Sequence, residues 1–293
     1  MHIIMGGTGH VGSAVASALL ARGETVAIVT HDVHRARGWI ARGAEVLEAD
    51  AREPASLRAA FRRGSRAFLL NPPAAPCTDT DAVERQTVAS ILAALAGSGL
   101  EKVVAASTGG AQAGDRIGDL NVLWELEQGL RRQPIPAAIQ RGAYYMSNWD
   151  AQIEAVRATG QLQAMFPADM PIPMVAPCDL GTFAAERLLS PVDDLALRHV
   201  EGPRRYSAAD VARVFADALG RPVEVVVTPR GQLHQAFEAL GFSRIAAESY
   251  ARMTALSIDS GFEMPADALK GQTRLEDYVR NLLAKPISSS GET

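Results

Sequence analysis

The chain has 293 residues, of which 47% are hydrophobic and 21% charged; these proportions are typical of globular proteins and exclude a disordered or fibrous one. The formal net charge of -4 gives no general attraction to phosphate backbones, so nucleic acid is not an expected partner. No apolar run is long enough to span a membrane, and a strand begins directly after Met1 without a secretory signal, which predicts a cytoplasmic protein without membrane contact.

The two cysteines, Cys77 and Cys178, lie far apart and have no metal-ligand spacing. They predict neither a disulfide framework nor a zinc site, so we expect two buried free thiols and no metal. Lysine is scarce, because only three of the 29 basic residues are lysines: Lys102, Lys270 and Lys285.

Short apolar runs alternate with helical patterns through the first half of the chain. The apolar run at residues 2–5 ends at a glycine pair and precedes apolar residues at helical spacing, which predicts a strand, a turn and a helix. Further strands are expected at residues 25–30, 44–47, 67–70 and 103–106, and further helices at 56–61 and 81–96. This alternation predicts an α/β fold of the Rossmann type, a doubly wound parallel sheet with helices on both faces.

The alternation weakens beyond about residue 142, where prolines interrupt the sequence. We therefore expect an NAD(P)-binding Rossmann domain at residues 1–150 and a smaller C-terminal α/β lobe for a substrate or partner at 151–293, with a segment near 175–190 returning to the Rossmann core. Two pairs with capping-box spacing, Ser207 with Asp210 and Thr273 with Glu276, predict helix starts in this lobe.

The turn after the first predicted strand reads Gly-Gly-Thr-Gly-His-Val-Gly at residues 6–12. Glycines let a backbone turn tightly and approach a pyrophosphate, whose charge is met by the N–H groups at the start of the next helix. A tight turn without a ligand would also use glycines, but the position at the start of an alternating pattern favours a dinucleotide site. The predicted cofactor-binding residues here are Gly6, Thr8, Gly9, His10, Val11 and Gly12.

The end of the second predicted strand bears on the choice of dinucleotide. An acidic side chain there bonds the ribose 2′-hydroxyl of NAD, whereas a cationic one accommodates the 2′-phosphate of NADP. His31 ends this strand and Arg35 follows, with no carboxylate before Asp32. This pattern favours NADP over NAD as the cofactor, with His31 and Arg35 near the phosphate; as an alternative, both are ordinary surface residues.

Three more residues follow predicted strands at the edge where such sheets bind ligands. Asp50, after the third strand, is placed to accept a hydrogen bond from an adenine amino group, or else it caps the next helix. Asn71 and Pro72 follow the fourth strand and are either part of the cofactor crevice or a turn that ends the strand.

Several segments, in this order, resemble the NmrA-like family of atypical short-chain dehydrogenases. They are the glycine turn, Phe-Leu-Leu-Asn-Pro-Pro at 68–73, and Arg-Gly-Ala-Tyr-Tyr-Met-Ser-Asn at 141–148, which is similar to the family's Arg-Pro-Gly-Phe-Phe-Met-Glu-Asn. Segments at 179–185 and 201–207 also fit, so the resemblance covers most of the chain. It implies either an NADPH-dependent oxidoreductase that reduces a small quinone, azo compound or phenylpropanoid, or a non-catalytic redox sensor that reports the dinucleotide state to a protein partner.

The usual apparatus for proton transfer is absent from the sequence. Standard short-chain dehydrogenases use a Tyr-x-x-x-Lys pair, but no tyrosine here has a lysine four residues later. The resemblance also implies a lysine three residues before a glutamate; Glu127 matches the glutamate, and Trp124 stands in the lysine position. We therefore expect either a sensor or a reductase in which water or the substrate supplies the proton.

Two residues are candidates for a catalytic role. Ser107, directly after the fifth strand, occupies the place of a substrate-orienting hydroxyl in the broader superfamily, or it bonds the local backbone. Tyr144, with Tyr145 and Met146, could floor a pocket for a small aromatic substrate or could pack in the core. Trp149 and Met165 are expected to continue an apolar wall.

Overall fold

The computed structural model describes residues 1–262 and 264–284, so Lys285 lies outside the described part. Its main sheet has eight strands, all parallel, in the order β13-β10-β6-β5-β4-β1-β2-β3. These strands are β1 (His2–Met5), β2 (Val26–Thr30), β3 (Glu45–Glu48), β4 (Arg66–Leu69), β5 (Lys102–Thr108), β6 (Ala137–Gly142), β10 (Arg198–Glu201) and β13 (Leu269–Lys270). The predicted α/β fold with a doubly wound parallel sheet is confirmed, and β1 pairs with both β2 and β4 at the point where the strand order reverses.

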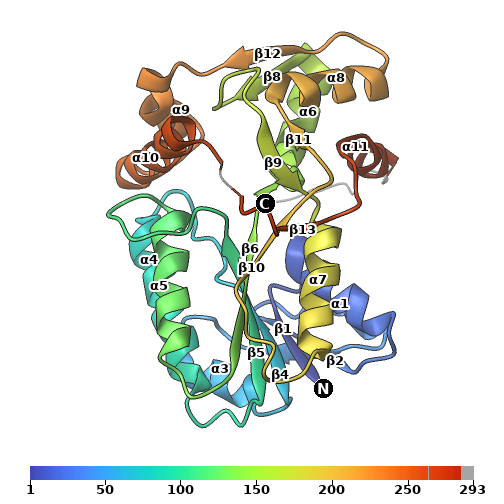
Figure 1. The fold of residues 1–293 in the computed structure, drawn as a ribbon, viewed down its shortest axis with the longest axis vertical. Helices are drawn as coiled ribbons and strands as arrows, with labels where there is room; N and C mark the ends of the chain where they lie inside the picture. Colours follow the sequence, from blue (N-terminus) through green and yellow to red (C-terminus); the bar gives the residue numbers. More distant parts are fainter. Residues whose placement is uncertain (263, 285–293) are drawn as a thin grey trace.

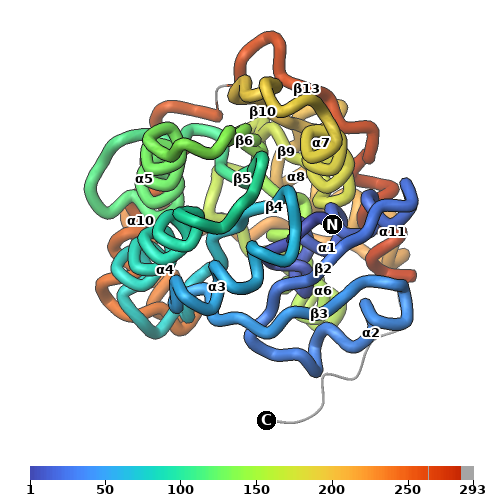
Figure 2. The backbone as a smooth tube through the Cα atoms, turned by 90° about the horizontal axis from the view of Figure 1, so that it is seen from below, coloured from blue at the N-terminus to red at the C-terminus, as the bar shows by residue number. Residues whose placement is uncertain are grey.

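Helices cover both faces of this sheet, as Figures 1 and 2 show. One face carries α1 (His10–Leu20), α2 (Arg37–Ile40) and α7 (Pro177–Leu189); the other carries α3 (Pro54–Phe61), α4 (Thr80–Leu95) and α5 (Asp119–Arg131). Successive side chains of a strand point to opposite faces, so Ile3 packs with the α3–α5 layer and Ile4 with the α1–α7 layer. The central strands β1 and β2 are therefore buried along their whole length.

A smaller lobe lies above the carboxyl ends of the strands (Figure 1). Its strands are β7 (Tyr144–Tyr145), β9 (Ile172–Val175) and β11 (Arg205–Tyr206) in one sheet, and β8 (Gln161–Ala164) and β12 (Glu224–Val227) in another. Its helices are η1 (Met146–Gln152), α6 (Ile153–Thr159), α8 (Ala208–Leu219), η2 (Arg230–Gln232), α9 (Leu233–Ala239), α10 (Arg244–Ser260) and α11 (Leu275–Ala284). The lobe has its own apolar core. No helix in the described ranges has the length and apolar character needed to cross a membrane.

One predicted capping box is confirmed and the other is wrong. The Ser207 hydroxyl and the Asp210 carboxylate cap the start of α8 reciprocally. The box at Thr273 does not form, because α11 begins at Leu275 and the Thr273 N–H, which the Glu276 carboxylate would accept from, donates to Asp179 Oδ2 at 3.0 Å. The expectation of buried thiols is also wrong, since Cys77 and Cys178 lie exposed in a loop and in the first turn of α7.

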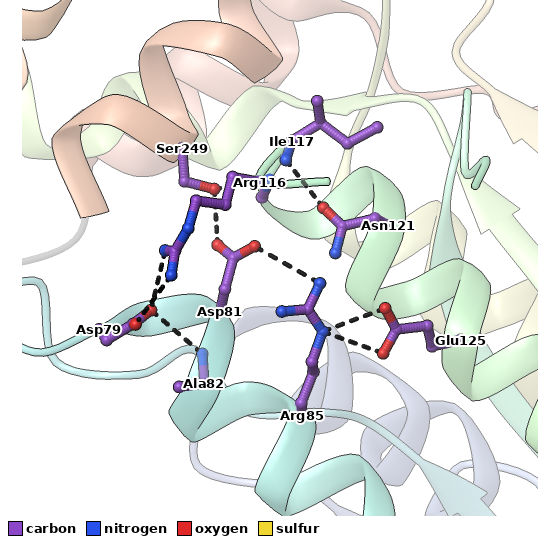
Figure 3. A network of polar contacts seen from close by, with 10 residues as sticks. Asp79, Asp81, Ala82, Arg85, Arg116, Ile117, Asn121, Glu125 and Ser249 are labelled. Atoms are coloured by element: carbon purple, nitrogen blue, oxygen red, sulfur yellow. Dashed lines mark hydrogen bonds and ion pairs between the residues drawn. The ribbon is translucent and has the colours of Figure 1, made fainter. Parts of the chain in front are cut away.

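Helix α10 is tied to the helical layer beneath it by polar contacts, some of which Figure 3 shows. The Ser249 hydroxyl donates to Asp81 on α4 at 2.6 Å and accepts from the Gly118 N–H at 2.9 Å. The Ser243 hydroxyl at the start of α10 donates to the carbonyl of Thr78 at 2.7 Å. These bonds fix α10 beside the carboxyl ends of β4 and β5.

Candidate functional site

The glycine turn has the geometry that a phosphate-binding loop needs. Gly6 adopts a φ of +68°, and a Cβ on Gly12 would lie 2.3 Å from the Gly6 carbonyl oxygen, so neither position tolerates a side chain. Gly9 is different, because a Cβ there would meet only the Gly6 oxygen, at 3.5 Å. Helix α1 starts after Gly9 with no side-chain cap on its first N–H groups. The start of α1 thus presents backbone donors to an anion.

The other residues predicted in this turn differ in how much of their side chains is exposed to solvent. Thr8 is half-buried and His10 is exposed, so both side chains are accessible to a ligand. Val11 is 5% exposed and packs in the core between the sheet and α1. Its side chain cannot reach a cofactor, so its predicted role rests on its backbone N–H.

The predicted specificity residues lie along one edge of the sheet. His31 and Arg35 are exposed after β2, and Arg35 makes no ion pair or hydrogen bond with another described residue. Asp50, after β3, accepts a hydrogen bond from the Arg52 N–H at 2.8 Å. That bond, the Arg52 guanidinium and His31 hold the pKa of Asp50 below its usual range. Asp50 does not cap α3, whose N-cap is Glu53, and its contact with an adenine stays a prediction.

Asn71, after β4, lines a cavity with a volume of about 410 Å³. Its Oδ1 is buried without a hydrogen-bond partner, which is costly unless a ligand supplies a donor. Pro72 is half-buried and outside the lining, whereas Pro73 is part of it. Leu70 joins this cavity to the glycine turn, because its side chain lies against Gly6.

Ser107 lines the same cavity and is part of a buried polar group. Its hydroxyl donates to Glu127 Oε1 at 2.5 Å, and Arg141 binds both oxygens of Glu127 at 2.8 and 2.7 Å. The sequence predicted that the Ser107 hydroxyl either orients a substrate or bonds the local backbone, and neither alternative included a carboxylate partner. Trp124, in the lysine position of the family pattern, is absent from the lining among the described residues.

An aromatic wall closes the side of the cavity that faces the lobe. Tyr144 meets Phe166 nearly edge-on, with ring centroids 5.7 Å apart, and Phe262 lies 5.4 Å from Phe166 and 6.4 Å from Tyr144. All three rings line the cavity. Trp149 and Met165, expected in this wall, instead pack in the lobe core and are not in the described lining.

The two tyrosines at the cavity are weak acids. Burial raises the pKa of Tyr144 to about 12, and burial together with the charge of Asp119 raises the pKa of Tyr145 to about 12. In a Tyr-x-x-x-Lys pair the lysine lowers the tyrosine pKa, and here the shift has the opposite sign. The proposed catalytic role of Tyr144 stays a prediction; its position suits contact with a flat substrate.

Sequence reasoning missed the acidic residues and the α10 residues of the site. Asp119 lines the cavity, and Glu84 on α4 lies behind it with 2% of its surface exposed. A signal for Glu84 exists, since it precedes the buried Val88 and Ile91 by four and seven residues on one helix face. Met253 and Thr254 line the cavity from α10, and no local pattern marks them.

These features fit a dinucleotide. The glycine cradle and the bare start of α1 suit a pyrophosphate. The unpartnered Asn71 Oδ1 offers an acceptor in the cavity lining. Among the described residues we find no side chain that fills the space over Gly9.

Comparisons with known proteins agree with this arrangement. The sequence matches the NmrA-like family over residues 2–279. A curated relative, the NAD(P)H azoreductase of Xenophilus azovorans, is 25% identical over 292 residues, which cover 100% of this chain and 96% of the relative.

Two solved structures have the same fold. The triphenylmethane reductase of Citrobacter sp., complexed with NADP(H), aligns with a TM-score of 0.80 at 18% identity over 96% of this chain and 100% of the other. An NADPH-dependent quinone oxidoreductase of Escherichia coli, complexed with NADPH, aligns with a TM-score of 0.78 at 18% identity over 97% and 100%. The family match spans nearly all of the sequence, and the chain therefore belongs to the NmrA-like family.

Proposed function

We propose that the protein is an NADPH-dependent reductase of small, flat aromatic or conjugated acceptors such as quinones and azo compounds. One observation carries the proposal: a single cavity is lined on one side by Asn71 and Ser107 at the ends of the sheet strands, and on the other by Tyr144, Phe166 and Phe262. Its volume of about 410 Å³ suits a small ligand. The azo, triphenylmethane and quinone reductases among the similar proteins support the same class.

We also propose different roles for the two parts of the chain. Residues 1–150 would hold the dinucleotide, with the pyrophosphate on Gly6 to Gly12 and a 2′-phosphate near His31 and Arg35, although NAD is an alternative cofactor. Residues 151–293 would supply the substrate wall, while α7, β10 and β13 from this half pack in the Rossmann core. When bound, the dinucleotide would supply a hydride, and the chain's residues would orient the acceptor and exclude water.

A broad acceptor screen tests this function. Purified protein is mixed with NADPH and a panel of quinones, azo dyes and triarylmethyl dyes, and NADPH consumption is followed by its absorbance, with NADH in parallel. We expect turnover of at least one aromatic acceptor and faster turnover with NADPH than with NADH. Tight NADPH binding without turnover above the buffer rate would contradict the reductase and leave the redox sensor as the explanation of the site.

A further inference from the structure

Two carboxyl groups from neighbouring helices meet at the wall of the cavity. Asp119, in the first turn of α5, lines the cavity, and Glu84 on α4 lies behind it, buried. Their side chains hydrogen-bond to each other. A carboxylate can only accept, so a bond between two carboxyl groups requires that one of them is protonated. The pair therefore holds a proton next to the space where a substrate would bind.

The groups around the pair keep this proton in place. Asp81 faces the pair from α4, Tyr145 from β7 and Tyr250 from α10. The loop after β4 contributes the Ala74 N–H, which donates to Glu84 Oε1 at 2.9 Å. These neighbours are acidic or neutral, so none of them is a cation that favours the ionised pair.

The nearby guanidinium groups bind other carboxylates than the pair, as Figure 3 shows, and Arg85 also lies 3.9 Å from an oxygen of Asp81. Arg85 binds both oxygens of Glu125 at 3.0 and 3.1 Å, and Arg116 binds Asp79 at 3.4 and 3.5 Å. Within the described ranges, no arginine or lysine donates a hydrogen bond to either carboxyl of the pair. Burial, followed by the charge of Asp119, raises the pKa of Glu84 to about 8, and burial likewise raises the pKa of Asp119.

The proposed reaction needs a proton that the tyrosines are poorly suited to give. An azo compound that has gained a hydride carries a negative charge on nitrogen, and this anion must be protonated to give the hydrazine. The raised pKa values of Tyr144 and Tyr145 make both phenols weak donors. We propose, on the basis of the reductase function above, that the pair delivers a proton to the reduced acceptor: Glu84 holds the proton at rest, and Asp119 at the cavity wall passes it on.

The O–H bond of Glu84 breaks as its proton passes to the Asp119 carboxylate, and the Asp119 O–H bond formed in this way then breaks as the proton bonds to the acceptor's anionic nitrogen or oxygen. Glu84 is then ionised, and the Ala74 N–H stabilises its charge. The pair is left with two negative charges until a proton from solvent restores it. Acceptor, hydride and proton together give the neutral product.

An experiment with two kinds of acceptor can distinguish proton delivery from hydride transfer. Reduction of an azo dye consumes a hydride and a proton, whereas a cationic triarylmethyl dye becomes neutral on gaining a hydride alone. Glu84→Gln preserves the shape, since its amide can donate to Asp119 and accept from Ala74, but it has no transferable proton. Asp79→Asn is the matched control, because it removes an acidic charge outside the cavity and still accepts from the Ala82 N–H that caps α4.

We expect Glu84→Gln to lower kcat for the azo dye about 100-fold, a usual size for general acid catalysis, and to leave the rate with the cationic dye within about threefold. In the wild type, kcat for the azo dye should fall as the pH rises through the pKa of the pair. Asp79→Asn should behave like the wild type. If Glu84→Gln lowers kcat equally with both dyes, or does not lower it with the azo dye, the proposed proton delivery is wrong and the reductase function stands. If the wild type reduces neither dye, the proposed reductase function is wrong as well.

A second measurement does not depend on activity. Infrared difference spectra of the protein without cofactor should show the C=O stretch of a protonated carboxyl at neutral pH. This band should disappear at high pH and be altered in Glu84→Gln and Asp119→Asn, but not in Asp79→Asn. If neither of the first two variants changes a protonated-carboxyl band, the pair does not hold the proton and the proposal fails.

Discussion

Ser107 on β5 donates its hydroxyl proton to the buried carboxylate of Glu127 on α5. Because that proton is engaged and Arg141 fixes the carboxylate, the serine oxygen can accept a hydrogen bond from a ligand but cannot readily donate one. This direction suits an amide or hydroxyl donor in the cavity. It does not suit polarisation of a substrate carbonyl.

The Glu127–Arg141 pair should matter for stability. Glu127→Gln leaves the Arg141 charge without its carboxylate, which should lower the free energy of unfolding by about 3 kcal/mol. Glu125→Gln on the same helix is the control: its side chain is 37% exposed, and its loss should cost less than about 1 kcal/mol. Urea unfolding of the three proteins measures both differences, and equal losses would contradict the assigned role.

The glycine turn predicts two opposite outcomes for two substitutions. Gly9→Val should fold normally, because a Cβ there meets nothing closer than 3.5 Å, but its side chain should block the pyrophosphate. Gly12→Ala should instead destabilise the fold, since the added carbon would lie 2.3 Å from a backbone oxygen. Thermal unfolding and NADPH titration by tryptophan fluorescence distinguish them. Unchanged NADPH affinity in Gly9→Val would mean that the phosphates bind elsewhere.

Arg35 should set the preference for the phosphorylated cofactor. It has no partner among the described residues, so a 2′-phosphate would form a new charge-assisted hydrogen bond there. Arg35→Ala should raise the Kd for NADPH about tenfold or more, with a smaller effect from His31→Gln. The Kd for NADH serves as the internal control and should stay constant. A parallel rise in both Kd values would place the ribose away from Arg35.

The carboxyl pair should make stability depend on pH. The pKa of Glu84 in the folded protein, about 8, lies above its ordinary value of 4.5. Its stabilising contribution is therefore complete below the ordinary value and is lost as the pH rises through the folded value, because the folded state must then give up the proton. Unfolding free energy measured across this window should fall in the wild type, and the fall should be smaller in Glu84→Gln. Identical slopes would show that Glu84 ionises normally.

The aromatic wall should govern substrate binding more than the chemical step. Tyr144→Phe keeps the ring and loses a weakly acidic phenol, so kcat should change by less than about threefold. Tyr144→Ala removes the ring that packs against Phe166 and Phe262, and should raise KM for aromatic acceptors. Steady-state kinetics with one acceptor compare the two. A large loss of kcat in Tyr144→Phe would instead make its hydroxyl the proton donor.

The Rossmann core was predictable from the sequence because its strands are local apolar runs, and the predicted strand at residues 67–70 corresponds to β4 at Arg66–Leu69. The glycine turn was predictable because the backbone requires glycine at Gly6, which has a positive φ, and at Gly12, where a Cβ would clash with the Gly6 carbonyl oxygen. The lining of the cavity was harder to predict from the sequence, because Phe262 and Met253 line it only through packing between segments that are distant in the chain. The prediction that Trp149 belongs to the cavity wall was wrong for the same reason. A tryptophan in the sequence indicates a buried, packed side chain, but the sequence does not show which residues it packs against.

The most direct test of the central claim follows the hydrogen atom itself. The protein is given NADPH labelled with deuterium on the reactive face of the nicotinamide and a cationic triarylmethyl dye, and the colourless product is analysed by mass spectrometry. Direct hydride transfer in the cavity predicts one deuterium on the central carbon of the dye for each NADPH oxidised. Unlabelled product, or NADPH that binds tightly and is never oxidised, would contradict the account.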